Sequence, residues 1–375
     1  MKFLAASLLL GFLTTLIGTP YARKYLLSSG IYGIDQQKKS KPKLATSGGI
    51  SVVFGFIIAI TSYLGINSFI INSTVSISLI LAALSSVCII TLIGLVDDIH
   101  INIEKYIHDE LEIEEFEMDL GLPEDEKLPF DRVREVVSVK FGEESNNNDL
   151  HREGLRQNVK MLFVLPAALP LIAVGAGSWS MNLPILGVIE WGIIYPLVLL
   201  PVGLLFVSNV VNMLAGTNGL SAGMSLVTSI ALGIFAYINQ NIEAVVISWS
   251  LSAVLLAFLY YNFYPSSILP GDSLTYLCGA AMFAAIVTGN MEKFGVFIFL
   301  PWIAEFFLKL RSGFTAHSWG QIQEDGSLKS QHDKIYSLTH IFMRKGFDER
   351  QITVSLITLQ SIICITGLLI FTVML

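Results

Sequence analysis

The sequence predicts an all-α polytopic membrane protein with about ten transmembrane helices. Of the 375 residues, 53% are hydrophobic and 14% are charged, and the mean hydropathy is +0.65. This composition is too apolar for a soluble globule of this length. Apolar runs of about 20 residues, the length that crosses a bilayer, recur along the chain. Lysines and arginines gather in alternate connections between these runs, as the positive-inside rule requires.

The apolar runs place the helices in order. A cleaved signal peptide is the alternative for the first run, but Arg23 and Lys24 follow it directly. Positive charge there favours a retained helix with the N-terminus outside, and an even number of spans then puts the C-terminus outside too. We expect spans near residues 3–19, 47–66, 75–96, 160–177, 185–208, 219–238, 244–262, 273–289, 294–310 and 352–373.

Negative charge is concentrated in one segment. Residues 97–154 hold 19 of the 30 acidic residues and 6 of the 23 basic ones, so the acidic balance describes this segment and not the whole surface. We expect a small soluble insertion there, on the cytoplasmic side, with a regulatory or structural role. The predicted parts are transmembrane helices 1–3 with a cytoplasmic loop at 20–46 (1–103), the acidic insertion (104–154), and helices 4–10 with cytoplasmic catalytic loops (155–375).

The polar loops fall on the cytoplasmic side of this arrangement. A secondary transporter keeps its ionisable residues near the middle of the membrane, whereas here the acids well inside predicted spans are Glu190 and Glu305. Polar groups gathered at one interface favour an enzyme that joins a water-soluble substrate to a lipid headgroup. A nucleotide-sugar transporter is the alternative from another class.

Three aspartates stand where predicted spans meet these loops. Asp97 and Asp98 end the third span, and Asp272 begins the eighth after a Pro-Gly turn. Two adjacent acids repel each other and sit poorly at the negative end of a helix dipole. Mg²⁺ prefers carboxylate and phosphate oxygens and would relieve both problems. Each motif alone also fits a simpler interpretation, a solvated helix end or an N-cap.

Residues 208–223 read SNVVNMLAGTNGLSAG between two apolar runs. Asn209 and Asn212 are three residues apart and share one face of a helix. Gly216 and Gly219 let the backbone approach a ligand without an intervening Cβ. We expect the carboxamides to ligate a metal or to bind a nucleobase such as uracil, without adding negative charge. The alternative is a glycine-rich re-entrant turn in which the asparagines cap broken helices.

Several motifs together resemble the polyprenyl-phosphate N-acetylhexosamine-1-phosphate transferases over nearly the whole chain. They are an early KP…GG loop, GLVDD (94–98), NVVNMLAGTNGL (209–220), PGDSLTY (270–276) and a late basic loop. Bacterial members typically show DGxDG in the asparagine loop. Here Ala215 and Asn218 replace both aspartates, which is similar to the dolichyl-phosphate GlcNAc-1-phosphotransferase branch of eukaryotes and archaea.

The resemblance implies an activity and its partners. GlcNAc-1-phosphate would pass from UDP-GlcNAc to dolichyl phosphate, giving GlcNAc-diphosphodolichol and UMP, the first lipid-linked step of N-glycosylation. A bacterial-type enzyme that uses undecaprenyl phosphate is the alternative. Mg²⁺, or Mn²⁺ in its place, would be the cofactor; membrane lipid would surround the enzyme, nucleic acid would not bind, and a homodimer is one option. The membrane would be an archaeal cell membrane or the endoplasmic reticulum, with the active site facing the cytoplasm.

The resemblance also implies roles for individual residues. Asn212 and Asp272 would hold the metal ion beside three catalytic residues, Asp97, Asp98 and Lys160. The residues expected to bind substrate are Asp35, Lys41, Asn209, Gly216, Asn218 and His317.

The sequence departs from the family pattern in three places. Ile101 stands where a DDxxD motif needs its third acid, and the acidic insertion separates Asp98 from the LRQNVK that usually follows at once. In the late loop, Ser318 and Gln321 occupy positions where arginines often flank the histidine. These departures leave the sugar preference open.

Overall fold

The computed structural model describes residues 1–71, 74–99, 164–183 and 187–373. Apart from Ile99, these residues belong to one unit made of Met1–Asp98 and Gln157–Leu375. The predicted insertion at 104–154 and the predicted catalytic residue Lys160 lie outside the described residues, so both stay predictions, as does the division into parts built on them.

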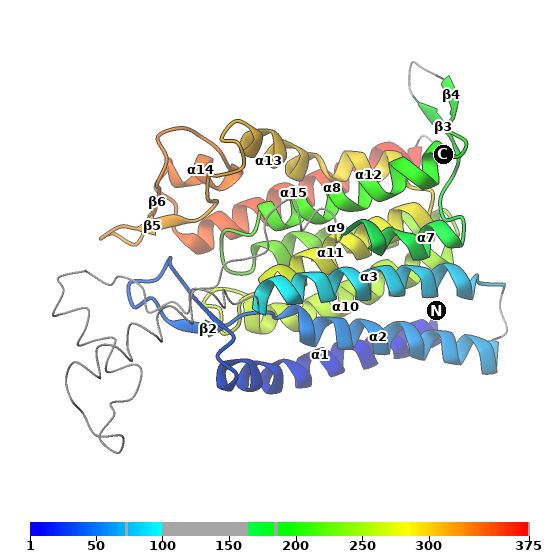
Figure 1. Ribbon diagram of the computed structural model, residues 1–375, viewed down its shortest axis with the longest axis horizontal. Helices are drawn as coiled ribbons and strands as arrows, with labels where there is room; N and C mark the ends of the chain where they lie inside the picture. Colours follow the sequence, from blue (N-terminus) through cyan, green and yellow to red (C-terminus); the bar gives the residue numbers. More distant parts are fainter. Residues whose placement is uncertain (72–73, 100–163, 184–186, 374–375) are drawn as a thin grey trace, which may run out of the picture. The chain divides into compact units, whose positions relative to one another are not determined.

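The described chain is mostly helical (Figure 1). The α-helices are α1 (Lys2–Ser28), α2 (Gly49–Ile66), α3 (Ile77–Ile99), α7 (Leu169–Ala173), α8 (Leu200–Met213), α9 (Leu220–Ile238), α10 (Ile242–Asn262), α11 (Gly271–Thr288), α12 (Glu292–Ile298), α13 (Leu300–Leu310), α14 (Leu338–Met343) and α15 (Glu349–Val373). Shorter helical turns of other types are η1 (Asn67–Ile71), η3 (Leu165–Ala168) and η4 (Tyr195–Leu199).

The prediction of an α-helical polytopic membrane protein is confirmed. Within the described ranges, eight helices are long and apolar enough to cross a membrane, namely α1, α2 with η1, α3, η4 with α8, α9, α10, α11 and α15. The total of ten spans and the placement of both termini outside stay predictions.

The chain differs from the predicted spans in two described regions. The run at 294–310 is divided into α12 and α13, because Pro301 lies in the first turn of α13 and has no N–H to continue the preceding helix. Within the run at 185–208, residues 187–190 form a strand instead of a helix. This strand, β4 (Gly187–Glu190), pairs antiparallel with β3 (Ser180–Leu183), and α8 begins only after η4.

Two further hairpins lie at the opposite end of the helices from β3 and β4 (Figure 1). In the first, β1 (Tyr32–Ile34) pairs antiparallel with β2 (Lys43–Ala45), with Gly33 opposite Leu44. In the second, β5 (Gly320–Ile322) pairs antiparallel with β6 (Leu328–Ser330). Both marked termini lie at the β3–β4 end. Loops from distant parts of the sequence therefore gather at one end of the bundle.

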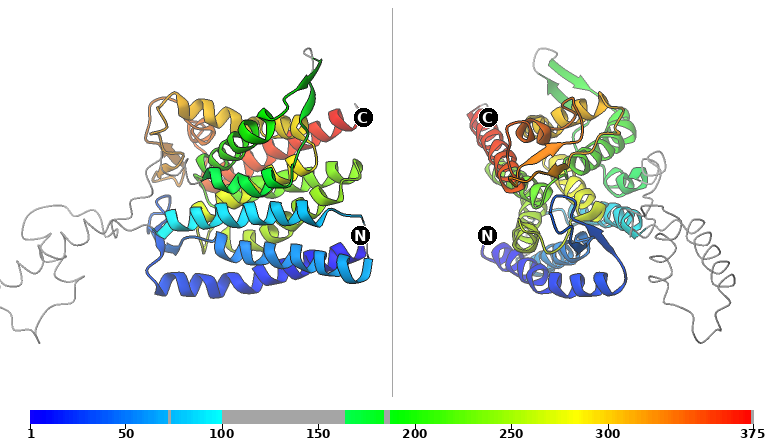
Figure 2. Two further views of the ribbon diagram at one scale, coloured as in Figure 1. Left: turned by 45° about the vertical axis from the view of Figure 1, so that its right-hand side comes forward. Right: turned by 90° about the vertical axis from the view of Figure 1, so that its left-hand side faces the viewer.

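Helix α11 lies among the other helices and is buried from Ser273 to Thr288. It packs against α2, α8, α9 and α10, and Figure 2 shows these helices running side by side. Small residues such as Gly279 make this possible, because an added Cβ there would lie 2.6 Å from the Cα of Ser208 in α8. Close approach of backbones is the usual way in which helices pack in membranes. The position of α11 matters because its first turn lies at the loop-rich end.

Candidate active site

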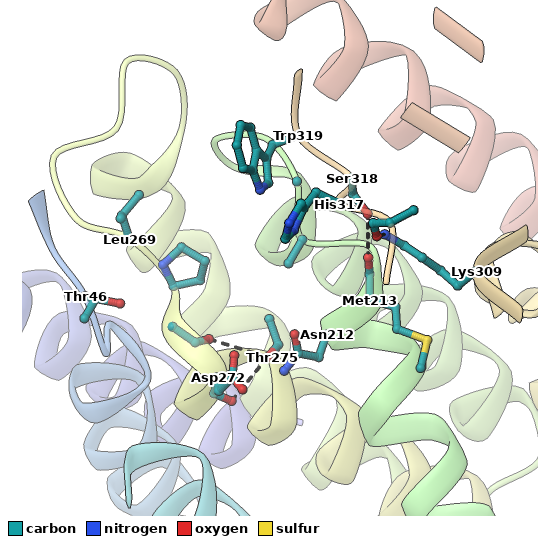
Figure 3. Close-up of a pocket in the computed structure, with 15 residues that line it drawn as sticks. Thr46, Asn212, Met213, Leu269, Asp272, Thr275, Lys309, His317, Ser318 and Trp319 are labelled. Atoms are coloured by element: carbon teal, nitrogen blue, oxygen red, sulfur yellow. Dashed lines mark hydrogen bonds between the residues drawn. The ribbon is translucent and has the colours of Figure 1, made fainter. Parts of the chain in front are cut away.

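A pocket of about 400 Å³ opens at the loop-rich end of the bundle, between the start of α11 and the loop that follows α13 (Figure 3). Residues from four segments of the sequence line it. They are Thr46, Asn212, Met213, Ala215, Gly216, Leu269, Pro270, Gly271, Asp272, Thr275, Lys309, Ala316, His317, Ser318 and Trp319. The predicted metal ligands Asn212 and Asp272 lie near each other there, with Thr275 between them in the view.

Asp98 at the end of α3 caps the start of α11. Its Oδ1 accepts a hydrogen bond from the backbone N–H of Asp272 at 2.7 Å, and its Oδ2 accepts one from the N–H of Ser273 at 3.1 Å. The first N–H groups of a helix have no partner inside the helix, and a carboxylate there also interacts favourably with the helix dipole. Asp98 therefore fixes the backbone that carries Asp272.

Two glycines allow the elements around this cap to approach closely. A Cβ on Gly94 in α3 would lie 2.6 Å from the backbone oxygen of Asp272, and a Cβ on Gly49 in α2 would lie 2.5 Å from the backbone nitrogen of Leu274. Real Cβ atoms do not come so close to backbone atoms. Gly94, the glycine of GLVDD, thus allows the end of α3 that carries Asp97 and Asp98 to pack closely against the start of α11.

Tyr276, one helical turn after Asp272, connects the acidic groups. It is 1% exposed, and its hydroxyl lies beside the Asn212 side chain and within electrostatic reach of Asp272, Asp97 and Asp98. The Asn212 side chain of α8 thus lies beside the phenol of α11, and the acids of α3 and α11 act on it electrostatically. The i, i+4 spacing from Asp272 was a signal in the sequence that would have revealed this residue.

The two asparagines at the end of α8 are placed differently. Asn212 lines the pocket, whereas the amide of Asn209 donates back to the carbonyl of Leu205 in its own helix at 2.8 Å. Asn209 does not belong to the pocket lining. The shared helical face did not bring both carboxamides to the pocket, because Asn209 lies three residues further from the C-terminal end of α8, about 4.5 Å along the helix axis.

The glycine-rich loop after α8 is held by a buried polar cluster. The amide of Asn218 donates to Asp35 at 3.0 Å, and its backbone N–H donates to Glu349 at 2.8 Å. Lys38 forms ion pairs with Glu349 and, at 3.4 Å, with Asp35. Gln37 donates to the carbonyl of Gly216. Asp35 and Asn218 therefore hold this loop in place. Gly216, in the same loop, lines the pocket.

Sequence reasoning missed Glu349 and Gln37, because their partners lie far away along the chain. Glu349 opens α15 and would be taken for an ordinary helix-start acid. The predicted substrate residue Lys41 is exposed and is not among the residues that line the pocket.

The loop after α13 brings His317 to the pocket. His317 is exposed as a whole residue, with part of its ring covered, and the ring lies 5.2 Å from that of Trp319, centroid to centroid. Burial, followed by the nearby charges of Lys309 and His332, lowers the pKa of His317 below its usual range. The imidazole is therefore neutral at pH 7 and can both donate and accept a hydrogen bond.

His340 in α14 fixes the backbone of this loop. Its Nδ1 accepts from the N–H of Tyr336 at 3.3 Å, so its Nε2 is the donor toward the carbonyl of His317 at 2.9 Å. Burial lowers the pKa of His340, which favours this neutral form. The neutral His340 ring thus positions His317.

Comparisons with known proteins find similar sequences. The family described as "Glycosyl transferase family 4" matches residues 147–290, which contain the asparagine loop and Asp272. A protein of Saccharolobus solfataricus, provisionally named a UDP-N-acetylglucosamine–dolichyl-phosphate N-acetylglucosaminephosphotransferase, is 29% identical over 99% of this chain and 98% of its own. A protein of Sulfolobus acidocaldarius with the same provisional name is 29% identical over 91% of this chain and 87% of its own.

A eukaryotic relative extends the comparison. The UDP-N-acetylglucosamine–dolichyl-phosphate N-acetylglucosaminephosphotransferase of Dictyostelium discoideum is 24% identical over 90% of this chain and 81% of its own. Because the archaeal and eukaryotic relatives match the chain almost from end to end, the likeness includes the loops as well as the helices. Residues 147–290 are thus similar to glycosyl transferase family 4, and nearly the whole chain is similar to these archaeal and Dictyostelium proteins.

Proposed function

We propose that the protein transfers GlcNAc-1-phosphate from UDP-GlcNAc to dolichyl phosphate, giving GlcNAc-diphosphodolichol and UMP. The names of its archaeal and Dictyostelium relatives support this activity. The observation that carries it is the convergence of Asp98, Asn212 and Asp272, from three helices, on the start of α11. A carboxylate and a carboxamide facing one pocket suit a negatively charged substrate when a divalent cation lies between them.

Mg²⁺, or Mn²⁺ in its place, is the proposed cofactor, with Asp272 and Asn212 as its ligands. Both side chains offer oxygen atoms to the pocket, which is the donor type that Mg²⁺ prefers. No group of three His, Cys, Asp or Glu side chains able to hold a metal occurs among the described residues. A site with few protein ligands suits Mg²⁺, because this ion usually keeps water molecules and substrate phosphate in its coordination shell. When bound, the ion would neutralise charge on the diphosphate.

The residues of the chain would bind and orient the two substrates. A phosphate oxygen of the lipid forms a bond to the phosphorus that carries the sugar, while the bond from that phosphorus to the bridging oxygen breaks and UMP leaves. A phosphate monoester has its second pKa at about 6, so the lipid phosphate is already nucleophilic at neutral pH. Asp98 would hold Asp272 in position, and the neutral His317 would hydrogen-bond the sugar. Gly216 would let the nucleotide approach the backbone.

The lipid acceptor would lie along α3. Leu92, Val96 and Ile99 are exposed on this helix, at 60%, 50% and 40%, and their spacing places them on one face. The same helix ends in Asp97 and Asp98, so a polyprenyl chain on this face would bring its phosphate toward the pocket. The many basic residues in the loops at this end favour the cytoplasm as the compartment it faces, in an archaeal cell membrane or the endoplasmic reticulum.

A transfer assay tests this function. Purified protein in lipid nanodiscs, given radiolabelled UDP-GlcNAc, dolichyl phosphate and Mg²⁺, is expected to yield labelled lipid and an equal amount of UMP. Undecaprenyl phosphate in a parallel reaction should give the slower transfer. Failure to form a lipid product with any UDP-N-acetylhexosamine and any polyprenyl phosphate, from protein that remains folded, would overturn the proposal. Uptake of intact UDP-sugar into proteoliposomes would instead support the transporter.

A further inference from the structure

The pocket contains a positive charge that the proposed chemistry has not used. Lys309 in the last turn of α13 lines the pocket, and within the described part of the chain it is the only lysine or arginine that does so. Figure 3 shows Lys309 with His317 and Ser318 on one side of the pocket and Asp272 with Thr275 on the other. A cation and an acid thus stand at opposite ends of the same space.

Lys309 is unusual because it is buried. It is 5% exposed, although lysine is rarely buried without a reason. Its amine donates to the carbonyl of Ala316 and lies 4.0 Å from Oε1 of Glu305. An ammonium group has three donors. At 4.0 Å the ion pair is longer than a hydrogen bond, so the amine has capacity to bind a group in the pocket.

The partner of this ion pair is itself occupied elsewhere. Glu305 is fully buried, and its Oε2 accepts from the backbone N–H of Leu338 at 2.7 Å. Its Oε1 accepts from the hydroxyl of Ser318 at 3.3 Å. Glu305 thus ties α13 to the pocket loop and to α14, and it leaves the amine of Lys309 at the pocket wall. A purely structural lysine would not need to border the pocket.

The acids around the pocket explain why a cation is needed there. Asp97, Asp98 and Asp272 all lie within electrostatic reach of Tyr276, and a diphosphate would add further negative charge. Positive charge held in place before the substrate arrives stabilises such a group, because the charge does not have to be reorganised when the substrate binds. An ammonium group is a usual partner for phosphate oxygens.

We propose that Lys309 binds the diphosphate of the nucleotide-sugar donor directly, at the end of the pocket opposite Asp272. The inference rests on the proposed function, and it adds a donor-binding residue to it. Lys309 would be specific for the donor, since the dolichyl phosphate acceptor is expected to approach from α3.

Calorimetric titration of the full-length protein with UDP-GlcNAc in the presence of Mg²⁺ tests the proposal. Lys309→Met is expected to weaken binding by about 10- to 100-fold, the range for loss of a hydrogen bond to a charged group. Lys309→Arg should retain most of the affinity. The inhibition constant of uridine, which has no phosphate, should stay within about twofold of wild type. The KM for UDP-GlcNAc should rise while the KM for dolichyl phosphate does not change.

A double variant separates binding from a structural role. Lys309→Met alone leaves the buried Glu305 charge without its partner, which can destabilise the protein. In Glu305→Gln/Lys309→Met no charge is left alone, so folding should recover while UDP-GlcNAc binding stays weak. Lys345→Met, at an exposed lysine after α14, is the matched control and should bind as wild type does.

Each result has a clear meaning. Wild-type affinity for UDP-GlcNAc in the double variant would overturn the role of Lys309 and leave the proposed function intact. An equal loss of uridine binding would show that Lys309 only shapes the pocket, which also overturns the inference. Absence of UDP-GlcNAc binding by the folded wild-type protein would overturn the inference and the proposed function together.

Discussion

Asp272→Asn is expected to lower kcat/KM for UDP-GlcNAc by at least ~10²-fold, the low end for removing a group that stabilises developing charge. The change keeps the shape of the side chain and removes its negative charge. Asp272 faces the pocket beside Asn212, so with two neutral carboxamides the proposed metal site would lose its anionic ligand. The backbone N–H of Asp272 would still donate to Asp98, and the fold should therefore survive.

The measurement is the transfer rate as a function of Mg²⁺ concentration. For Asp272→Asn, half-maximal activity should require a higher Mg²⁺ concentration than for wild type. Asp325→Asn is the control, because Asp325 is an exposed residue of the β5–β6 turn whose carboxylate accepts hydrogen bonds from Ser327, two residues further along the chain. Near-normal turnover and an unchanged Mg²⁺ requirement in Asp272→Asn would mean that the metal binds elsewhere.

Asp98→Asn is expected to cost about 10²-fold in rate, as does misplacement of a reacting group by about 1 Å. Both carboxylate oxygens of Asp98 accept backbone N–H groups at the start of α11. An asparagine side chain has one acceptor oxygen, so it could accept from only one of these two N–H groups. Its NH₂ group would face the other N–H group, which is also a donor. The first turn of α11 would then shift, and Asp272 would shift with it. In this account Asp98 is a positioning residue that acts through Asp272.

A double-mutant cycle distinguishes this role from an independent one. If Asp98 acts through Asp272, then Asp98→Asn/Asp272→Asn should be no slower than Asp272→Asn alone, because coupled residues are not additive. Rate losses that multiply in the double variant would show that Asp98 acts on the substrate by itself, as a base or a metal ligand. Circular dichroism melting of each variant checks that the helices remain folded.

The sequence predicted the helical class and most helices because apolar runs of membrane length carry a strong signal. The prediction of elements failed where the hydrophobic pattern was short or fitted both helix and strand. The run near 185–208 begins with a short apolar stretch, and such a stretch cannot be assigned to helix or strand by periodicity alone. The proline at position 301 was visible, but only the structure shows that it divides the run into α12 and α13.

At the site, the sequence motifs could be predicted, but the contacts of their residues with distant segments could not. Asn212 and Asp272 stand in recognisable loops, and the structure places both at one pocket. Asp98 was expected to act near the metal, whereas its contacts are with the backbone of α11. Lys309 and Glu349 gave no signal, because a lysine after an apolar run and an acid before one are ordinary at helix ends. Their roles depend on which distant segment packs beside them.

A divalent cation is expected to bind between Asp272 and Asn212 at the start of α11, where the nucleotide sugar would bind. Crystals of the protein grown with Mn²⁺ and UDP-GlcNAc would test it most directly, by anomalous difference maps at the manganese edge. We expect one strong peak between these two side chains, in contact with the diphosphate, and no peak there in Asp272→Asn. A peak elsewhere, or none in a map that shows the bound nucleotide sugar, would contradict it.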